Sequence, residues 1–144
     1  MSDLSKWESR QTILVTEDDA IVGLDLTDIL EAAGYRIAGP VNNSAEALEW
    51  LKTNVPDAVV LDLVLKDGSC TEIVRELRSR RIPFLIYSGR RQHQADVDLS
   101  DAKWLEKPAA HHDILTALAR LLQDPPPEWD SYGEEQQDGP SVAP

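Results

Sequence analysis

The stretch ILVTEDDAIVGLDL, residues 13–26, places an acidic cluster directly behind a short apolar run. Ile13–Thr16 is typical of a buried strand, and an amphipathic run begins after Glu17, Asp18 and Asp19. Neighbouring carboxylates repel one another, so solvent, a helix N-terminus or a cation must offset their charge. Two interpretations follow: these acids cap a helix, or they hold a metal ion.

The rest of the chain repeats this order of a short apolar run followed by an amphipathic run. Strands are predicted at 12–16, 35–41, 57–61, 82–87 and 102–105. Helices are predicted at 20–33, from 44 to about 54, after a capping-box pattern at 69–72, and around 114–122. Such alternation predicts an α/β fold, a doubly wound five-stranded parallel sheet covered on both faces.

Three local departures from this pattern are also expected. Pro40 should break the second strand, because proline cannot donate to a strand ladder. Lys66-Asp67-Gly68 is typical of a turn. The stretch 90–100 has few apolar residues, which predicts a short, irregular or mobile fourth helix.

The length of 144 residues fits one domain, expected at residues 11–123. Residues 1–10 form a polar lead, and residues 124–144 are predicted to be a disordered, acidic, Pro-rich tail. The net charge of −12 argues against a nucleic-acid partner, since phosphate backbones are bound largely by Lys and Arg. A single cysteine and the absence of a long apolar run favour a cytoplasmic protein with no membrane span.

Polar residues stand where the predicted strands end. Glu17 and Asp18 follow the first strand, Asp62 the third, Ser88 the fourth and Lys107 the fifth. Because ligands of open parallel sheets bind beyond the carboxyl ends of the strands, these groups should meet at one edge. Three carboxylates suit Mg²⁺. Asp62 could attack a phosphoryl group, with Lys107 neutralising charge and Ser88 donating a hydrogen bond.

Four fragments in this order, ILVTEDD, VVLDLVLKDGS, PFLIYSG and LEKP, resemble the response-regulator receiver domain. The resemblance covers about residues 11–123. It implies a flavodoxin-like sheet of strand order 2-1-3-4-5, with Asp62 as the phosphoacceptor. It also implies a sensor histidine kinase or phosphotransfer protein as the donor, and a downstream protein target that the sequence does not identify.

The resemblance also implies a Mg²⁺ ligand set. Asp18 and Asp62 would bind the ion through their side chains, Glu17 mainly through water, and Val64 through its backbone carbonyl. Each of these is an oxygen ligand, as Mg²⁺ prefers.

By the same resemblance, Ser88 and Lys107 contact the phosphoryl group. Trp104, three residues before the lysine, occupies the family's aromatic switch position, and Ser88 is its partner in the switch. The Lys107–Pro108 peptide is expected to be cis, an isomer that proline makes accessible.

The function predicted is therefore that of a phosphorylatable receiver domain that signals through protein contacts. The polar residues after 123 leave no room for an output domain, and no enzymatic activity beyond its own phosphorylation and dephosphorylation is expected. The alternative is a pseudo-receiver, a binding module that keeps the fold without the switch. A metal-dependent hydrolase is disfavoured, because Leu63 and Val64 follow Asp62 where a second acid would serve acid–base chemistry.

Overall fold

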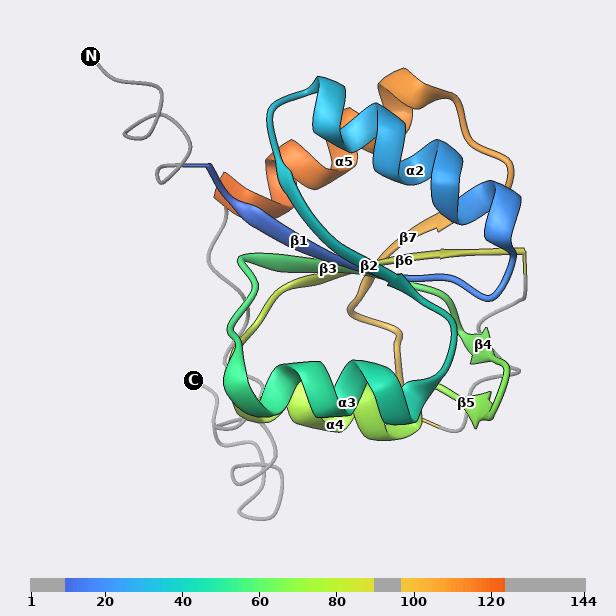
Figure 1. Ribbon diagram of the computed structural model, residues 1–144, viewed down its shortest axis with the longest axis vertical. Helices are drawn as coiled ribbons and strands as arrows, with labels where there is room; N and C mark the ends of the chain where they lie inside the picture. Colours follow the sequence, from blue (N-terminus) through green and yellow to red (C-terminus); the bar gives the residue numbers. More distant parts are fainter. Residues whose placement is uncertain (1–9, 90–96, 124–144) are drawn as a thin grey trace.

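The computed structural model describes residues 10–89 and 97–123, in which strands and helices alternate along the chain (Figure 1). The elements are β1 (Thr12–Thr16), α2 (Ala20–Ala32), β2 (Arg36–Val41), α3 (Ser44–Thr53), β3 (Ala58–Leu61), β4 (Val64–Leu65), β5 (Gly68–Ser69), α4 (Thr71–Ser79), β6 (Phe84–Ser88), β7 (Lys103–Glu106) and α5 (His111–Gln123). Predicted strands and observed strands agree to within about two residues at each end, apart from the short β4 and β5, which were not predicted.

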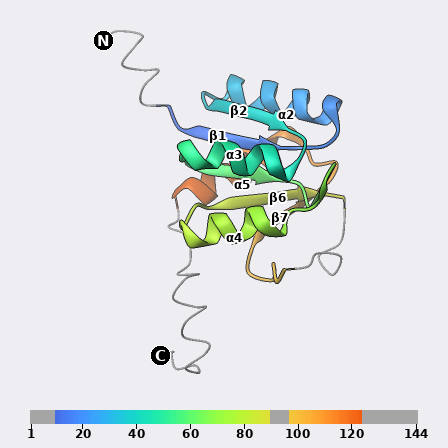
Figure 2. The ribbon, with the colours of Figure 1, turned by 60° about the horizontal axis from the view of Figure 1, so that its bottom comes forward.

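Five of the strands form one parallel sheet in the order β2-β1-β3-β6-β7. Because β4 and β5 form a separate antiparallel hairpin, this order is the predicted 2-1-3-4-5. Helices α2 and α5 cover one face of the sheet, and α3 and α4 cover the other (Figures 1 and 2). The flavodoxin-like, doubly wound fold predicted from the sequence is confirmed.

The core consists of two layers that the sheet separates. Alternate side chains of each strand enter opposite layers, as the two-residue period of a strand requires. Leu14, Val59 and Ile86 pack on the side of α3 and α4, while Val15 and Val60 pack on the side of α2 and α5. Since both faces are covered, the inner strands are apolar at nearly every position.

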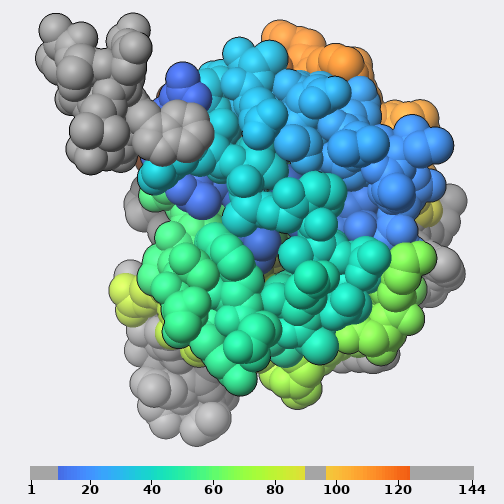
Figure 3. Space-filling model, in the orientation of Figure 1, coloured from blue at the N-terminus to red at the C-terminus, as the bar shows by residue number. Residues whose placement is uncertain are grey.

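The strand β2 lies at one edge of the sheet, between α2 and α3 (Figure 3). The strand continues past Pro40 to Val41, because an edge strand tolerates a residue that cannot donate, but its pairing with β1 is interrupted at Pro40, so the predicted break is confirmed only for the pairing. Ala38 pairs with Leu14 and Val41 with Thr16, which leaves one extra residue on β2 between these pairs. Gly39 accommodates the irregularity with a φ of +99°, at a position where a Cβ would lie 2.6 Å from the carbonyl oxygen of Val15.

The starts of α3 and α4 differ in how they are capped. Asn43 caps α3 by accepting a hydrogen bond from the backbone N–H of Glu46 at 2.7 Å. The capping box predicted at 69–72 is wrong: α4 begins after Cys70, which makes no side-chain capping bond. The hydroxyl of Ser69 instead accepts from the N–H of Thr71 at 3.3 Å.

The predicted weak fourth helix lies partly outside the described residues, at 90–96. The described remainder, 97–102, contains turns and bends without a helix. Arg78 of α4 anchors it by donating to the carbonyl oxygen of Asp98 at 2.7 Å and to the Asp101 carboxylate at 3.1 Å.

The polar lead at 1–9 and the tail at 124–144 also lie outside the described residues, so their predicted character stays a prediction. Of the helices in 10–89 and 97–123, none has the length and apolar composition needed to span a membrane.

Candidate functional site

The side chains predicted to gather at the carboxyl ends of the strands do so. An open cleft of about 320 Å³ lies at this edge of the sheet. Its lining comes from segments far apart in the sequence and consists of Asp18, Asp62, Val64, Ser88, Gly89 and Lys107. Parallel strands bring their carboxyl ends to the same edge, which explains the convergence.

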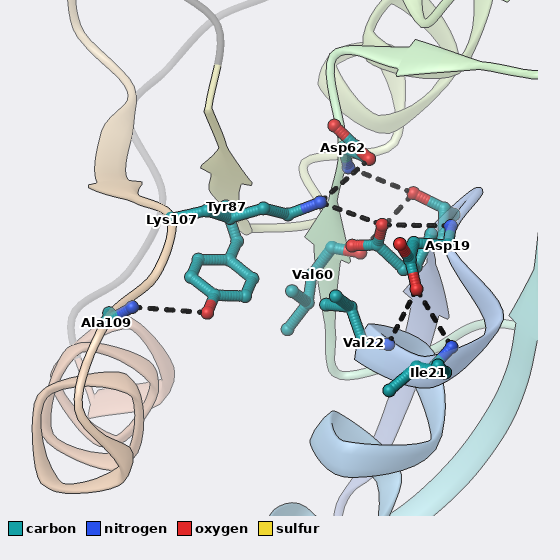
Figure 4. Close-up of polar contacts among 10 residues, drawn as sticks. Asp19, Ile21, Val22, Val60, Asp62, Tyr87, Lys107 and Ala109 are labelled. Carbon is teal, nitrogen blue, oxygen red and sulfur yellow. Dashed lines mark hydrogen bonds and ion pairs between the residues drawn. The ribbon is translucent and has the colours of Figure 1, made fainter.

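Glu17 and Asp18 join Asp62 in one acidic cluster. One carboxylate oxygen from each residue lies within 4.8 Å of the other two. Lys107 offsets part of their charge: its Nζ donates to Oε2 of Glu17 at 2.7 Å and to Oδ2 of Asp62 at 3.1 Å. Figure 4 shows the lysine side chain reaching across to Asp62. One ammonium among three carboxylates leaves negative charge in excess.

The third acid of the opening stretch serves a different purpose. Asp19 is the N-cap of α2, and its Oδ1 accepts from the backbone N–H groups of Ile21 and Val22 at 2.9 and 3.0 Å (Figure 4). The acidic run is therefore divided: Asp19 caps the helix, while Glu17 and Asp18 belong to the cluster that could hold a metal ion.

The cluster fits a divalent cation. Glu17 is 3% exposed, and its Oε1 is buried with no hydrogen-bond partner among the described residues. A buried carboxylate oxygen ordinarily has a partner. A hard cation coordinated by oxygen would provide one, and it would also offset the excess negative charge. The donor set of Glu17, Asp18 and Asp62 consists of carboxylate oxygens, which is the chemistry that Mg²⁺ requires.

Glu17 and Lys107 shift each other's pKa. Burial raises the pKa of Glu17 to about 7, and the charge of Asp62 adds to this, whereas the Lys107 hydrogen bond opposes it. For Lys107, burial favours the neutral amine, but its bonds to Glu17 and Asp62 outweigh burial and raise the pKa. The lysine therefore stays a cation at neutral pH.

Thr16 is a supporting residue that the sequence analysis did not single out. Its hydroxyl accepts from the backbone N–H of Asp62 at 3.2 Å and donates to the carbonyl oxygen of Val60 at 3.4 Å. It thereby ties the end of β1 to the end of β3, beneath the acidic cluster. The sequence signal for this role is a hydroxyl residue, Thr16, at the end of an apolar strand.

Asp67 is a second residue whose role was missed. It was assigned only to a turn, which the β4–β5 hairpin confirms. Its carboxylate accepts from the backbone N–H groups of Ser44 and Ala45 at 2.7 and 3.1 Å, and these bonds lower its pKa. The segment that follows Asp62 is thus fastened to the N-terminus of α3.

The remaining predicted site residues divide into two groups. Val64 and Ser88 line the cleft, and Ser88 is buried at the end of β6. Trp104 does not line it: it is a half-buried residue of β7 that packs on the layer beneath α3 and α4. The Lys107–Pro108 peptide is cis as predicted, and Gly39–Pro40 is cis as well.

Comparison with known families agrees with this arrangement. The family model described as "Response regulator receiver domain" matches residues 13–119. The chain belongs to this family.

Individual relatives are consistent with this assignment. The response regulator MprA of Mycobacterium avium is 32% identical over 124 residues, 83% of this chain and 54% of MprA, so the chain spans about half the length of that relative. The solution structure of SdrG from Sphingomonas melonis Fr1 has 32% identity and a TM-score of 0.69, covering 78% of this chain and 97% of SdrG.

A third structure agrees in fold. The receiver domain of the sensor histidine kinase PA1611 from Pseudomonas aeruginosa PAO1 has 22% identity and a TM-score of 0.71, covering 81% of this chain and all of that one. It was solved with a magnesium ion coordinated in its active-site cleft.

Proposed function

We propose that this receiver domain accepts a phosphoryl group on Asp62 from a phosphohistidine of a sensor histidine kinase or phosphotransfer protein, and that it signals through protein contacts. The observation that carries the proposal is the position of Lys107, whose ammonium bonds to Asp62 and Glu17 at the edge of an open cleft. That arrangement offers a nucleophilic carboxylate with a fixed positive charge beside it.

In the proposed step, a carboxylate oxygen of Asp62 attacks phosphorus and forms an acyl phosphate. The phosphorus–nitrogen bond of the phosphohistidine breaks, and its electron pair stays on the imidazole nitrogen, which takes up a proton. Lys107 bonds to the phosphoryl oxygens and balances their charge, and Ser88 donates a hydrogen bond to them.

Glu17, Asp18 and Asp62, with the Val64 carbonyl, would hold Mg²⁺ in this site. When bound, the ion offsets negative charge on the transferring group. The buried, unpartnered Oε1 of Glu17 supports this assignment.

Hydrolysis returns Asp62 to its resting state when water attacks phosphorus and releases inorganic phosphate. We infer no activity on outside substrates, because Leu63 and Val64 follow Asp62 where a second acid would be needed. Chemistry is therefore limited to the protein's own phosphorylation and dephosphorylation.

The direct test is incubation of the full chain with phosphoramidate and Mg²⁺, followed by intact mass spectrometry. We expect a gain of one phosphoryl group that disappears in Asp62→Asn and without Mg²⁺. Asp28→Asn, an exposed acid on α2, is the matched control and should behave as wild type. A folded wild-type chain that gains no mass would favour the pseudo-receiver.

A further inference from the structure

The ring of Tyr87 lies next to the ammonium group of Lys107. It is a buried residue of β6, directly before Ser88, and it packs in the layer covered by α2 and α5. We propose that Tyr87 is a positioning residue, which holds Lys107 where its ammonium meets Asp62. This inference rests on the proposed function, since the position of the Lys107 ammonium affects phosphorylation only if Asp62 accepts a phosphoryl group.

One tyrosine side chain contacts the chain on both sides of Pro108. The Nζ of Lys107 lies 5.7 Å from the centroid of the Tyr87 ring, within the range of a cation–π interaction. The Tyr87 hydroxyl accepts a hydrogen bond from the backbone N–H of Ala109 at 3.3 Å. Figure 4 shows the lysine stem extending above the ring while the hydroxyl points toward Ala109.

The backbone pairing beyond β7 explains why the N–H of Ala109 bonds to a side chain. The N–H of Lys107 donates to the carbonyl oxygen of Ser88 at 3.2 Å, just beyond the end of β7. Pro108 has no N–H to continue this pairing. The next backbone donor is Ala109, before α5 begins at His111, and the Tyr87 hydroxyl accepts from it.

These contacts restrict the position of the Lys107 ammonium. A lysine side chain is flexible and carries a compact charge, so its catalytic value depends on what restricts it. The carboxylates of Glu17 and Asp62 attract the ammonium from one side, and the Tyr87 ring attracts it from another. The ring and the Ala109 bond together limit how far Lys107 can move when a phosphoryl group replaces a carboxylate as its partner.

The first experiment measures the rate of phosphoryl gain of the full chain from phosphoramidate at saturating Mg²⁺. Tyr87→Phe keeps the ring and loses the bond to Ala109, so we expect a rate about threefold lower. Tyr87→Leu loses both contacts, and we expect a rate about tenfold lower. Tyr35→Phe is the matched control, because Tyr35 is half-buried at the opposite edge of the sheet, before β2, and should keep the wild-type rate.

A double-mutant cycle separates positioning from general destabilisation. In a Lys107→Met background, Tyr87→Leu should change the rate by less than about twofold, because its effect passes through the lysine. Equal slowing of both backgrounds by Tyr87→Leu, or wild-type rates for both Tyr87 variants, would overturn the positioning role and leave the proposed function intact. A wild-type chain with no phosphoryl gain would overturn both.

Discussion

The Nζ of Lys107 lies 2.7 Å from Oε2 of Glu17, although 90 positions separate the two residues in the sequence. The same ammonium lies 3.1 Å from Asp62, so it bridges the acids that follow β1 and β3. Since both carboxylates are buried, an uncompensated charge at either would be costly. Lys107 therefore stabilises the acidic cluster and supplies its positive charge.

Removing the positive charge should impair phosphorylation. We expect Lys107→Met to gain a phosphoryl group about 100-fold more slowly than wild type at saturating Mg²⁺, as for other donors that stabilise a transition-state anion. Lys103→Met, on the exposed face of β7, is the control and should react at the wild-type rate. A Lys107→Met rate within about threefold of wild type would contradict the assigned role.

Asp67 should make stability depend on pH. Its pKa is lower in the folded chain than the usual 3.8, so the folded state binds fewer protons than the unfolded state. The stabilisation by Asp67 is complete above pH 3.8 and is lost as the pH falls through its lower, folded-state pKa.

We therefore expect Asp67→Asn to lower the free energy of unfolding by about 0.5 kcal/mol at neutral pH, because the amide keeps one acceptor oxygen but loses the second acceptor and the negative charge at the N-terminus of α3. The difference from wild type should shrink at acid pH. Urea unfolding at pH 7 and at about pH 3 measures it, with Asp28→Asn as the control. A difference that is the same at both pH values would be inconsistent with a charge-dependent cap.

Comparison of Gly34 with Gly39 distinguishes the cost of backbone strain from the cost of steric overlap. Both Gly34 and Gly39 have positive φ, at +103° and +99°. A Cβ at Gly34 meets nothing within 4 Å, whereas one at Gly39 would lie 2.6 Å from the carbonyl oxygen of Val15.

Alanine at Gly34 should therefore lower the free energy of unfolding by about 1 kcal/mol, from conformational strain alone. At Gly39 it should lower it by about 3 kcal/mol, because β1 or β2 must also shift. Thermal unfolding of both variants checks this order. Equal losses of unfolding free energy in the two variants would show that the irregular β1–β2 pairing at Gly39 relaxes freely around the added methyl group.

Arg80 fastens α4 to the end of α3. Its guanidinium donates to the carbonyl oxygens of Leu51 and Asn54 at 2.7 and 3.0 Å. We expect Arg80→Met to lower the free energy of unfolding by about 1–2 kcal/mol, because these carbonyls lose a charged donor. Arg75→Met removes only an exposed ion pair with Glu72, and should change it by less than about 0.5 kcal/mol. Chemical denaturation of the two variants side by side provides the comparison.

Much of the fold could be predicted because it follows from local patterns. The apolar run 57–61 and the amphipathic run after Asp19 identify a strand and a helix without knowledge of their partners. Their alternation then restricts the topology, since parallel strands need crossover connections. The prediction was only partly right at Pro40: the pairing is interrupted there, but the strand continues, because an edge strand tolerates a proline.

The site could be predicted in part for the same reason. Glu17, Asp62 and Lys107 each follow a predicted strand, and strand ends meet in a parallel sheet. Tyr87 and Thr16 could not be assigned, because each acts within a strand through contacts with residues far away in the sequence.

The sequence by itself determined the α/β class and the set of charged residues available at the strand ends, because periodicity and composition are local properties. Only the tertiary structure decided how Glu17, Asp18 and Asp19 divide between the acidic cluster and the cap of α2. It also decided that Tyr87 lies beneath Lys107. Hydrogen bonds and charge pairs depend on distances of a few ångströms, and those distances are set by the register and packing of distant segments.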